Sequence, residues 1–380
     1  FEMHASPPTH CKMISVIIPA LNEELHIAAC LQSIRQAAHP SAEVEVIVVD
    51  NSSTDRTVAI AQSYGAHCMI EAKRGAAVAR NRGAREARGD VLAFLDADCI
   101  VDRNWLRNIE QAMSDGAIDA TMGDFKNVEE NLWAMLRFWR RLRWLESKAR
   151  RANGPVKVVT GNFIIRKQVF DAIGGFDEAF YRAHDTELGL RLYRQGYTVV
   201  HTPGLLITHH GPESLDEAIE TSRKHGFCTH GLFRKHGLEA SRALFPEVDR
   251  LYHRYLFTGK RPGSWIALAL LAPLLAAVKQ MLRLLLLALH AVGARHSLDR
   301  LFQIALDVAF FQGKVEAERL RRSGSDSRAP GRAPAGRAGA ADFARHEHLQ
   351  EGYARIDESM AVEQQPHSDV HHPADQRRAN

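Results

Sequence analysis

Short apolar runs alternate with segments of helical periodicity over the first hundred residues. Val91 to Leu95 is apolar throughout and β-prone, which is typical of a strand buried on both faces of a parallel sheet. The other patterns predict strands at 14–18, 44–49 and 67–70 and helices at 22–34 and 76–88, with Asn22 as a candidate N-cap. Between them, 52–55 leads into a further predicted helix that runs through Tyr64. This alternation predicts a parallel sheet with right-handed crossovers.

The pattern continues with shorter elements. It predicts strands at 120–123, 156–160, 162–166, 199–201 and 205–208, helices at 105–113, 132–151 and 184–197, and a short helix followed by a turn within 170–176. The 132–151 segment interleaves aromatic with cationic residues, which fits either a membrane interface or a helix packed on the sheet with its arginines reaching water. The expected fold class is α/β, with a mostly parallel nucleotide-binding sheet flanked by helices.

The most apolar part of the chain is 264–292, which Lys279 and Arg283 interrupt. Its uninterrupted apolar run of 14 residues is shorter than the roughly 20 that a spanning helix needs. Three interpretations stay open: a monotopic helical hairpin bent at Pro273, a transmembrane helix, and a soluble core helix. Flanking arginine and lysine residues favour an anionic leaflet, so we expect peripheral, monotopic or single-pass association with the cytoplasmic face of the inner or plasma membrane.

These patterns divide the chain into four expected parts. They are a leader at 1–12, an α/β domain at 13–240, a helical membrane-associating region at 241–322, and a tail at 323–380. The leader is short and polar and lacks the apolar stretch of a signal peptide. The tail has few large apolar residues, so disorder is expected there.

Composition excludes several classes of protein. With 380 residues and 45% apolar content, the chain can bury a sizeable core. A net charge of +4, from 49 basic and 45 acidic residues, does not suggest a nucleic-acid partner. The five cysteines are scattered and never in Cys-x-x-Cys spacing, which indicates neither a disulfide framework nor a zinc site and fits a reducing compartment.

Two carboxylates, Asp96 and Asp98, follow the buried strand one residue apart. A strand ending in Asp-x-Asp places both side chains at the carboxyl edge of the sheet, where open α/β folds bind ligands. Adjacent carboxylates repel each other unless a cation sits between them, so a metal-bound diphosphate is the implied ligand. The glycine-rich motifs of dinucleotide dehydrogenases and P-loop nucleotidases do not occur.

Six motifs, in this order, resemble the family-2 glycosyltransferases, which are inverting, metal-dependent enzymes of the GT-A fold. The resemblance covers roughly 13–236 and rests on the segments 16–23, 48–55, 79–83, 94–98, 174–178 and 185–191. It implies that Pro19, Ala20 and Glu23 border the nucleoside, that Asp50 accepts the N–H of a base such as uracil, and that Arg80 contacts the nucleotide. It further implies that Asp96 and Asp98 match the metal motif for Mn²⁺ or Mg²⁺, with Asp96 also on the nucleotide side.

The same resemblance makes Asp185 the candidate catalytic base; its alternative role is a helix N-cap. Glu187 and Arg191 belong to the matched motif as acceptor-side or supporting residues, and His184 replaces the family's usual acidic residue. His209 is the candidate third metal ligand, with His210 as its competitor. Leu21 stands where some relatives carry a base-stacking aromatic residue. The Gln-x-x-Arg-Trp motif of processive synthases is missing, which favours a single transfer.

The expected activity is therefore inverting, metal-assisted transfer of a sugar from a nucleoside-diphosphate sugar, with UDP as first choice, to a hydroxyl acceptor. The expected membrane contact makes a lipid-linked acceptor plausible, in cell-envelope polysaccharide or glycolipid synthesis. Two alternatives stay open. One is a noncatalytic nucleotide-sugar-binding or scaffold protein on the same fold. The other is a nucleotidyltransferase, which the missing glycine-rich phosphate loop disfavours.

Overall fold

The computed structural model describes residues 11–127, 132–133, 136, 158–210, 214–244, 264–291 and 295–323. The chain divides into two compact units, 1–328 and 329–380, and every described residue lies in the first. Most of the expected leader, cationic aromatic helix and disordered tail therefore falls outside the described residues.

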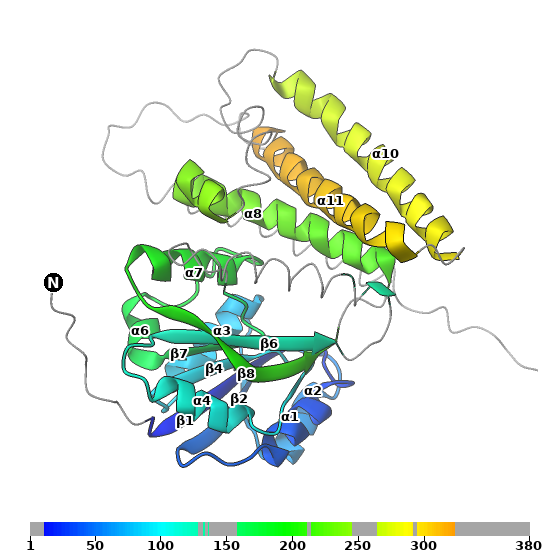
Figure 1. The fold of residues 1–380 in the computed structure, drawn as a ribbon. Helices are drawn as coiled ribbons and strands as arrows, with labels where there is room; N and C mark the ends of the chain where they lie inside the picture. Colours follow the sequence, from blue (N-terminus) through cyan, green and yellow to red (C-terminus); the bar gives the residue numbers. More distant parts are fainter. Residues whose placement is uncertain are drawn as a thin grey trace, which may run out of the picture. The chain divides into compact units, whose positions relative to one another are not determined.

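The N-terminal half forms the predicted alternation of strands and helices (Figure 1). The strands are β1 (Met13–Ala20), β2 (Glu43–Asp50), β3 (His67–Ile70) and β4 (Val91–Leu95), and all are parallel to their neighbours in this group. The helices are α1 (Ile27–Gln36), α2 (Thr57–Ser63) and α3 (Ala76–Glu86). All five residues of β4 are buried, which confirms it as a central strand.

The next part of the chain extends the sheet with β5 (Cys99–Val101), β6 (Ala120–Asn127), β7 (Asn162–Arg166) and β8 (Val199–His209). The strand order is β3-β2-β1-β4-β7-β6-β8-β5. Four of the seven neighbouring pairs are parallel, so the expected mostly parallel sheet is confirmed. The helices of this part are α4 (Trp105–Met113), α6 (Lys167–Ala172) and α7 (His184–Arg194).

Helices cover both faces of the sheet because successive strand residues point to opposite sides. Val16 and Ile18 pack in one apolar cluster with α1, α2 and α4, whereas Ile17 packs in another with α3, α6 and α7. Figure 1 shows α7 on one side of the sheet and α4 on the other. A sheet buried on both faces leaves its strand ends as the place for polar chemistry.

Several predicted elements need correction. Asn22 is not the N-cap of the first helix, which begins only at Ile27. The Asn22 backbone is left-handed (φ 56°) and its side-chain oxygen accepts a hydrogen bond from Thr54 N at 2.9 Å, so the residue shapes a loop instead. Residues 158–160 are not a strand, and 199–209 is one strand instead of two. The short helix expected within 170–176 lies earlier, at 167–172, whereas the turn expected at Gly174-Gly175 is present. The three-residue strand β5 was not predicted.

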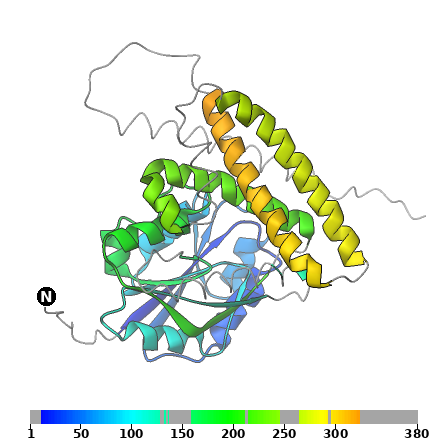
Figure 2. The same ribbon diagram turned by 45° about the horizontal axis from the view of Figure 1, so that its top comes forward.

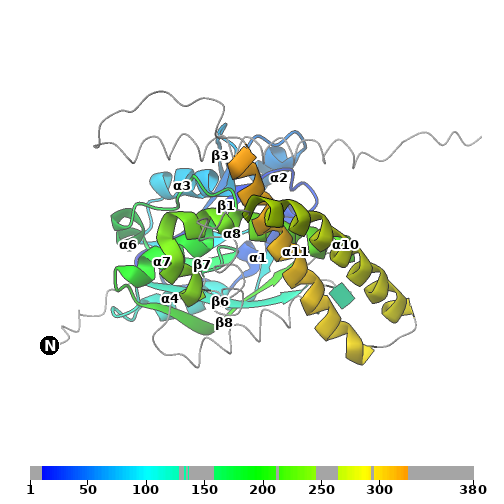
Figure 3. The same ribbon diagram turned by 90° about the horizontal axis from the view of Figure 1, so that it is seen from above.

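Three long helices follow: α8 (Leu215–Leu244), α10 (Ser264–Ala291) and α11 (Arg295–Ser323). Figures 2 and 3 show α10 and α11 side by side. Helices α8 and α11 approach closely through glycines, since a Cβ added at Gly226 would lie 1.8 Å from the Phe310 carbonyl oxygen. Helix α8 continues past residue 240, with non-helical geometry at Gly237, and the domain boundary expected there stays a prediction.

Helix α10 continues through Pro273, so a hairpin bent at this residue is not present. Its segment Pro273–His290 is long and apolar enough to cross a membrane, with a mean hydropathy of 1.4 and only 11% of its residues buried. Such low burial also argues against a soluble core helix. Leu282 and Leu286 face a cluster that includes Trp133 and Leu136, whereas other large side chains of α10 are exposed.

Candidate active site

The loops after β1 and β2 lie together at the carboxyl edge of the sheet. Ala20 and Asp50 are register partners at the ends of these strands, with Pro19 one position earlier. Asp50 is buried, and both of its carboxylate oxygens accept from Ser53 N, at 3.1 and 3.2 Å. Glu23 N donates to Thr57 Oγ1 at 2.8 Å. The residues expected near a nucleoside are therefore brought to one edge by strand pairing.

Asp96 lies at the same edge and is paired with Arg80 of α3. Arg80 Nη2 donates to Asp96 Oδ1 at 2.5 Å, and the Arg80 side chain is only 5% exposed while that of Asp96 is 32% exposed. Burial acts to raise the pKa of Asp96, but the charges of Arg80 and His209 outweigh it and hold the pKa below its usual value. The backbone of Gly161 also lies close to the Asp96 carboxylate. A Cβ added at this glycine would be only 2.9 Å from Asp96 Oδ2, so a larger residue would crowd the carboxylate.

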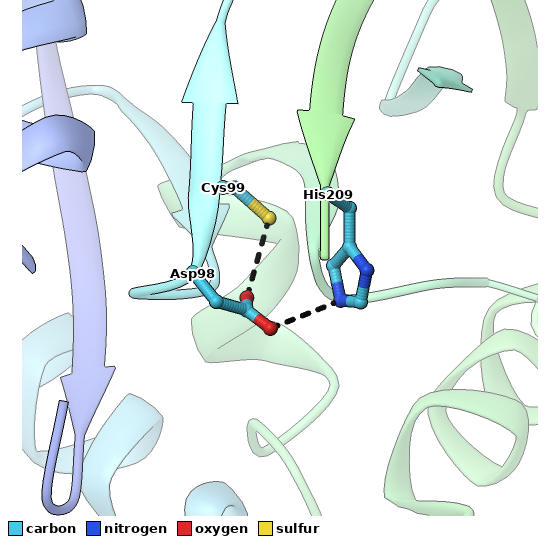
Figure 4. A group of neighbouring side chains, drawn as sticks. All are labelled: Asp98, Cys99 and His209. Atoms are coloured by element: carbon cyan, nitrogen blue, oxygen red, sulfur yellow. Dashed lines mark hydrogen bonds and ion pairs between the residues drawn. The ribbon is translucent and has the colours of Figure 1, made fainter. Parts of the chain in front are cut away.

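Asp98 and His209 meet where β5 pairs with the end of β8 (Figure 4). His209 Nε2 lies 3.4 Å from Asp98 Oδ2. Burial and the neighbouring Asp96 carboxylate raise the pKa of Asp98, although His209 partly opposes them. The antiparallel register places Cys99 directly opposite His209, and donor atoms of Asp98, Cys99 and His209 lie within 4.8 Å of one another. Cys99 was not predicted as part of this group.

This group fits the implied Mn²⁺ or Mg²⁺ in its chemistry. Carboxylate oxygens and an imidazole nitrogen suit Mn²⁺, and a cation would relieve the repulsion that raises the pKa of Asp98. The Cys99 thiol fits less well, because burial and the Asp96 and Asp98 charges raise its pKa far above the usual value and keep it protonated. Its Sγ donates weakly to Asp98 Oδ1 at 3.7 Å.

Glu23 adds a further carboxylate to this edge. Burial and the charges of Asp98 and Asp96 raise its pKa, against an opposing hydrogen bond with His26 at 3.0 Å. The His26 ring lies against that of His210, with 4.7 Å between centroids. His210 therefore faces His26, whereas His209 faces Asp98, and the geometry favours His209 as the metal-side histidine.

Asp185 is the second residue of α7 and is half-buried. The N-cap position belongs to Ala183, whose backbone is left-handed (φ 64°), so the alternative N-cap role for Asp185 is wrong. Asp185 Oδ1 instead accepts from Thr186 N at 2.6 Å. His184, which directly precedes Asp185, lies 2.8 Å from Arg80, and Arg80 pairs with Asp96, so one side chain links the candidate base to the metal motif.

Glu187 and Arg191 form a closed ion network one turn further along α7. The Glu187 side chain has no exposed surface and contacts Arg191 Nη2 at 2.7 Å, Lys235 Nζ at 3.1 Å and His236 Nε2 at 3.0 Å. Arg191 also donates to the carbonyl oxygens of Ile173 (2.6 Å) and Gly175 (2.7 Å). Every oxygen of Glu187 is engaged, so this network holds α7, the Gly174–Gly175 turn and α8 together.

Two asparagines that the sequence analysis passed over shape the neighbouring loops. Asn81 Oδ1 accepts from Phe176 N and its Nδ2 donates to Phe176 O, each at 2.9 Å. Asn51 Oδ1 accepts from Gly75 N at 2.7 Å, at the start of α3. Both lie within the motifs that carried the resemblance, at 79–83 and 48–55, and that position was the only available signal for their roles.

Paired carboxylates and a histidine thus meet at the carboxyl edge of an α/β sheet of the GT-A type. Residues 15–174 match the model of glycosyl transferase family 2. This part of the chain is therefore a family-2 glycosyltransferase domain, and the expected family and fold are confirmed.

Curated relatives agree with this assignment. The chain is 29% identical over 216 residues to the Bacillus subtilis protein named "Probable glycosyltransferase YdaM", covering 53% of this chain and 51% of the relative. It is 28% identical over 202 residues to glycosyltransferase AglE of Haloferax volcanii, covering 52% of this chain and 66% of that protein. The match thus spans between half and two thirds of these relatives.

A solved structure shares the fold over most of its length. The mannosyltransferase PcManGT from Pyrobaculum calidifontis superposes with a TM-score of 0.56 at 22% identity, covering 84% of this chain and 90% of that one. That protein was crystallised with GDP-Man and Mn²⁺.

Proposed function

We propose that this protein is an inverting glycosyltransferase that moves a sugar from a nucleoside-diphosphate sugar to a hydroxyl acceptor, with Asp185 as catalytic base. The observation that carries the proposal is the position of His184, which directly precedes Asp185 in α7 and lies 2.8 Å from Arg80, the partner of Asp96. A base and a cation-binding carboxylate near one another are what direct displacement of a diphosphate requires.

In this mechanism Asp185 accepts the proton of the acceptor hydroxyl while that oxygen forms a bond to the anomeric carbon. The bond from this carbon to the diphosphate breaks on the opposite face, so the configuration inverts. Negative charge develops on the leaving diphosphate, and the Arg80 guanidinium, which pairs with Asp96, supplies positive charge beside it. Asp98, Asp96 and His209 would hold the Mn²⁺ or Mg²⁺ ion, which when bound neutralises part of that charge.

The nucleoside is proposed to lie over the β1 and β2 loops, against Pro19, Ala20 and Glu23. Asp50 would accept an N–H of the base, which both uracil and guanine can donate. UDP-sugars stay the first choice, and the GDP-Man bound by the Pyrobaculum relative makes GDP-sugars the second. Release of UDP or GDP from a panel of sugar nucleotides distinguishes the two donors.

The decisive experiment compares wild type with Asp185→Asn for metal-dependent release of nucleoside diphosphate. We expect the variant to lose about 100-fold or more in turnover, since general base catalysis contributes roughly that much. Asp171→Asn is the matched control, because Asp171 lies on the surface helix α6 and pairs with Lys167. Unchanged release by Asp185→Asn would reject Asp185 as the base, and no release by wild type from any donor would reject the activity.

We also propose that α10 binds the cytoplasmic surface of a membrane and brings the site to a lipid-linked acceptor. Support comes from five exposed large apolar side chains on this helix: Leu274, Met281, Leu284, Leu285 and Leu287. In flotation with vesicles containing anionic lipid, wild type should rise with the vesicles and Leu284→Glu/Leu285→Glu should not. Equal flotation of both proteins would reject this surface.

A further inference from the structure

His184 is joined to Arg80 by one hydrogen bond between residues far apart in the chain. Its Nε2 lies 2.8 Å from Arg80 Nη1, and the two residues are 104 positions apart. A guanidinium can only donate, so Nε2 is the acceptor and the imidazole proton is on Nδ1. His184 therefore presents a neutral lone pair to a cation that also pairs with Asp96.

The Arg80 guanidinium has few other restraints. Its Nη2 donates to Asp96, while its buried Nε has no hydrogen-bond partner among the described residues. With a side chain only 5% exposed, water is poorly placed to supply the missing contacts. The orientation of this planar group thus depends on two hydrogen bonds, one to Asp96 and one to His184.

The imidazole of His184 lies in a buried, partly aromatic environment, and its Nδ1 has no hydrogen-bond partner among the described side-chain atoms. The residue is buried, and the Phe176 ring meets it nearly edge-on, at 88° with 5.5 Å between centroids. Burial and the charge of Arg80 lower the pKa of His184 to about 4, so the acceptor lone pair is present at neutral pH. His184 is also the first residue of α7, directly before Asp185.

We propose that His184 is a positioning residue that holds the Arg80 guanidinium toward the donor diphosphate, tying the helix of the base to the leaving-group side. This inference rests on the proposed function, because it requires a diphosphate to bind beside Arg80. A carboxylate at this position would add a second negative charge beside Arg80, which already pairs with Asp96. A neutral imidazole orients the cation without adding negative charge where the diphosphate would bind.

The test measures binding of UDP and GDP, each with Mg²⁺, by titration calorimetry. His184→Phe keeps a ring against Phe176 but removes the acceptor, and we expect about tenfold weaker binding, as for loss of one hydrogen bond to a charged group. His184→Gln restores an acceptor oxygen at similar reach and should bind within about threefold of wild type. His201→Phe is the control, since His201 pairs with Asp124 on the far strands β8 and β6.

A double-mutant cycle that combines His184→Phe with Arg80→Lys tests whether His184 acts through Arg80 or whether its loss disturbs the structure in general. Lysine keeps the charge but cannot donate to Asp96 and His184 in the same forked geometry. His184→Phe added to Arg80→Lys should therefore weaken binding by less than about twofold further. In turnover assays His184→Phe should raise the donor KM more than it lowers kcat.

The outcomes distinguish this inference from the proposed function. If wild type binds neither UDP nor GDP, the proposed function fails and the inference fails with it. If wild type binds and folded His184→Phe binds equally well, only the inference is overturned. Should His184→Phe not fold, ¹⁵N spectra of wild-type histidine decide: an Nδ1–H tautomer at His184 supports the inference, and an Nε2–H tautomer overturns it.

Discussion

The carboxylate of Glu187 in α7 and that of Asp98 at the edge of the sheet differ in the direction of their pKa shifts. Glu187 is fully buried and contacts the charged groups of Arg191 and Lys235 as well as His236. Burial opposes its ionisation, but these partners lower its pKa from 4.5 to about 2. Asp98 is 26% exposed and has a second carboxylate beside it, and its pKa is raised.

This difference in pKa distinguishes a carboxylate that stabilises the fold from one that is suited to bind a cation. A carboxylate whose oxygens are all taken by protein cations stabilises the fold and has nothing left for a ligand. A carboxylate short of positive charge destabilises its own ionised form and gains when a cation arrives. Glu187 and Asp98 should therefore respond to substitution in opposite ways.

The largest effect is expected from Asp98→Asn. Turnover with Mn²⁺ or Mg²⁺ should fall about 1,000-fold, since metal stabilisation of a leaving group contributes several kcal/mol. The melting temperature should stay the same or rise, because the variant removes repulsion between Asp98 and Asp96. Initial rates check the expected fall in turnover, and thermal melts check the expected melting temperature, with Asp171→Asn as the control for both. Near-normal turnover would contradict a role for Asp98 in metal binding.

Glu187→Gln should have the next largest effect, on stability. Breaking a buried ion network leaves Arg191 without its carboxylate partner and Lys235 with Asp177 alone, which costs about 3 kcal/mol in free energy of unfolding. Glu86→Gln is the matched control, because Glu86 makes the same i,i+4 pair with Arg82 but is 43% exposed, and it should cost less than about 0.5 kcal/mol. Urea unfolding measures both; equal losses would remove the distinction between the two carboxylates.

Acid should remove the same stabilisation step by step. The folded pKa of Glu187 is about 2, below its ordinary value of 4.5, so its contribution is fully present above pH 4.5 and is lost as pH falls toward 2. Between pH 6 and pH 3 this amounts to about 2 kcal/mol. The stability difference between wild type and Glu187→Gln should shrink by that amount over this range. A constant difference in urea unfolding would show that Glu187 is not ionised differently in the folded state.

The smallest effect is expected from Cys99→Ser. The buried thiol stays protonated and contributes little as a ligand, so Mn²⁺ affinity should change by less than about threefold. Stability should fall by about 1 kcal/mol, because a more polar hydroxyl replaces a buried thiol. Calorimetric titration with Mn²⁺ checks this, and a tenfold weaker affinity would make Cys99 a ligand.

Local sequence was sufficient for the elements whose pattern repeats within one segment. The buried strand β4, helix α3 and helix α7 were predicted because an apolar run or a helical period is a property of neighbouring residues. The same local signals placed Asp96 and Asp98 at a strand end and Asp185 at a helix start. Together with the order of the motifs, these signals predicted the α/β class and the family.

Tertiary structure alone decided the pairings between distant segments. The three-residue strand β5 forms because β8 offers it an antiparallel partner, and this register sets Cys99 opposite His209. Arg80 meets His184 across 104 positions, and Glu187 meets His236 across 49. Such contacts depend on how helices and strands stack, which no local pattern encodes. Sequence therefore determined which kinds of groups lie at the candidate site, and packing determined which carboxylates are paired with cations of the protein, as Glu187 is, and which are raised in pKa, as Asp98 is.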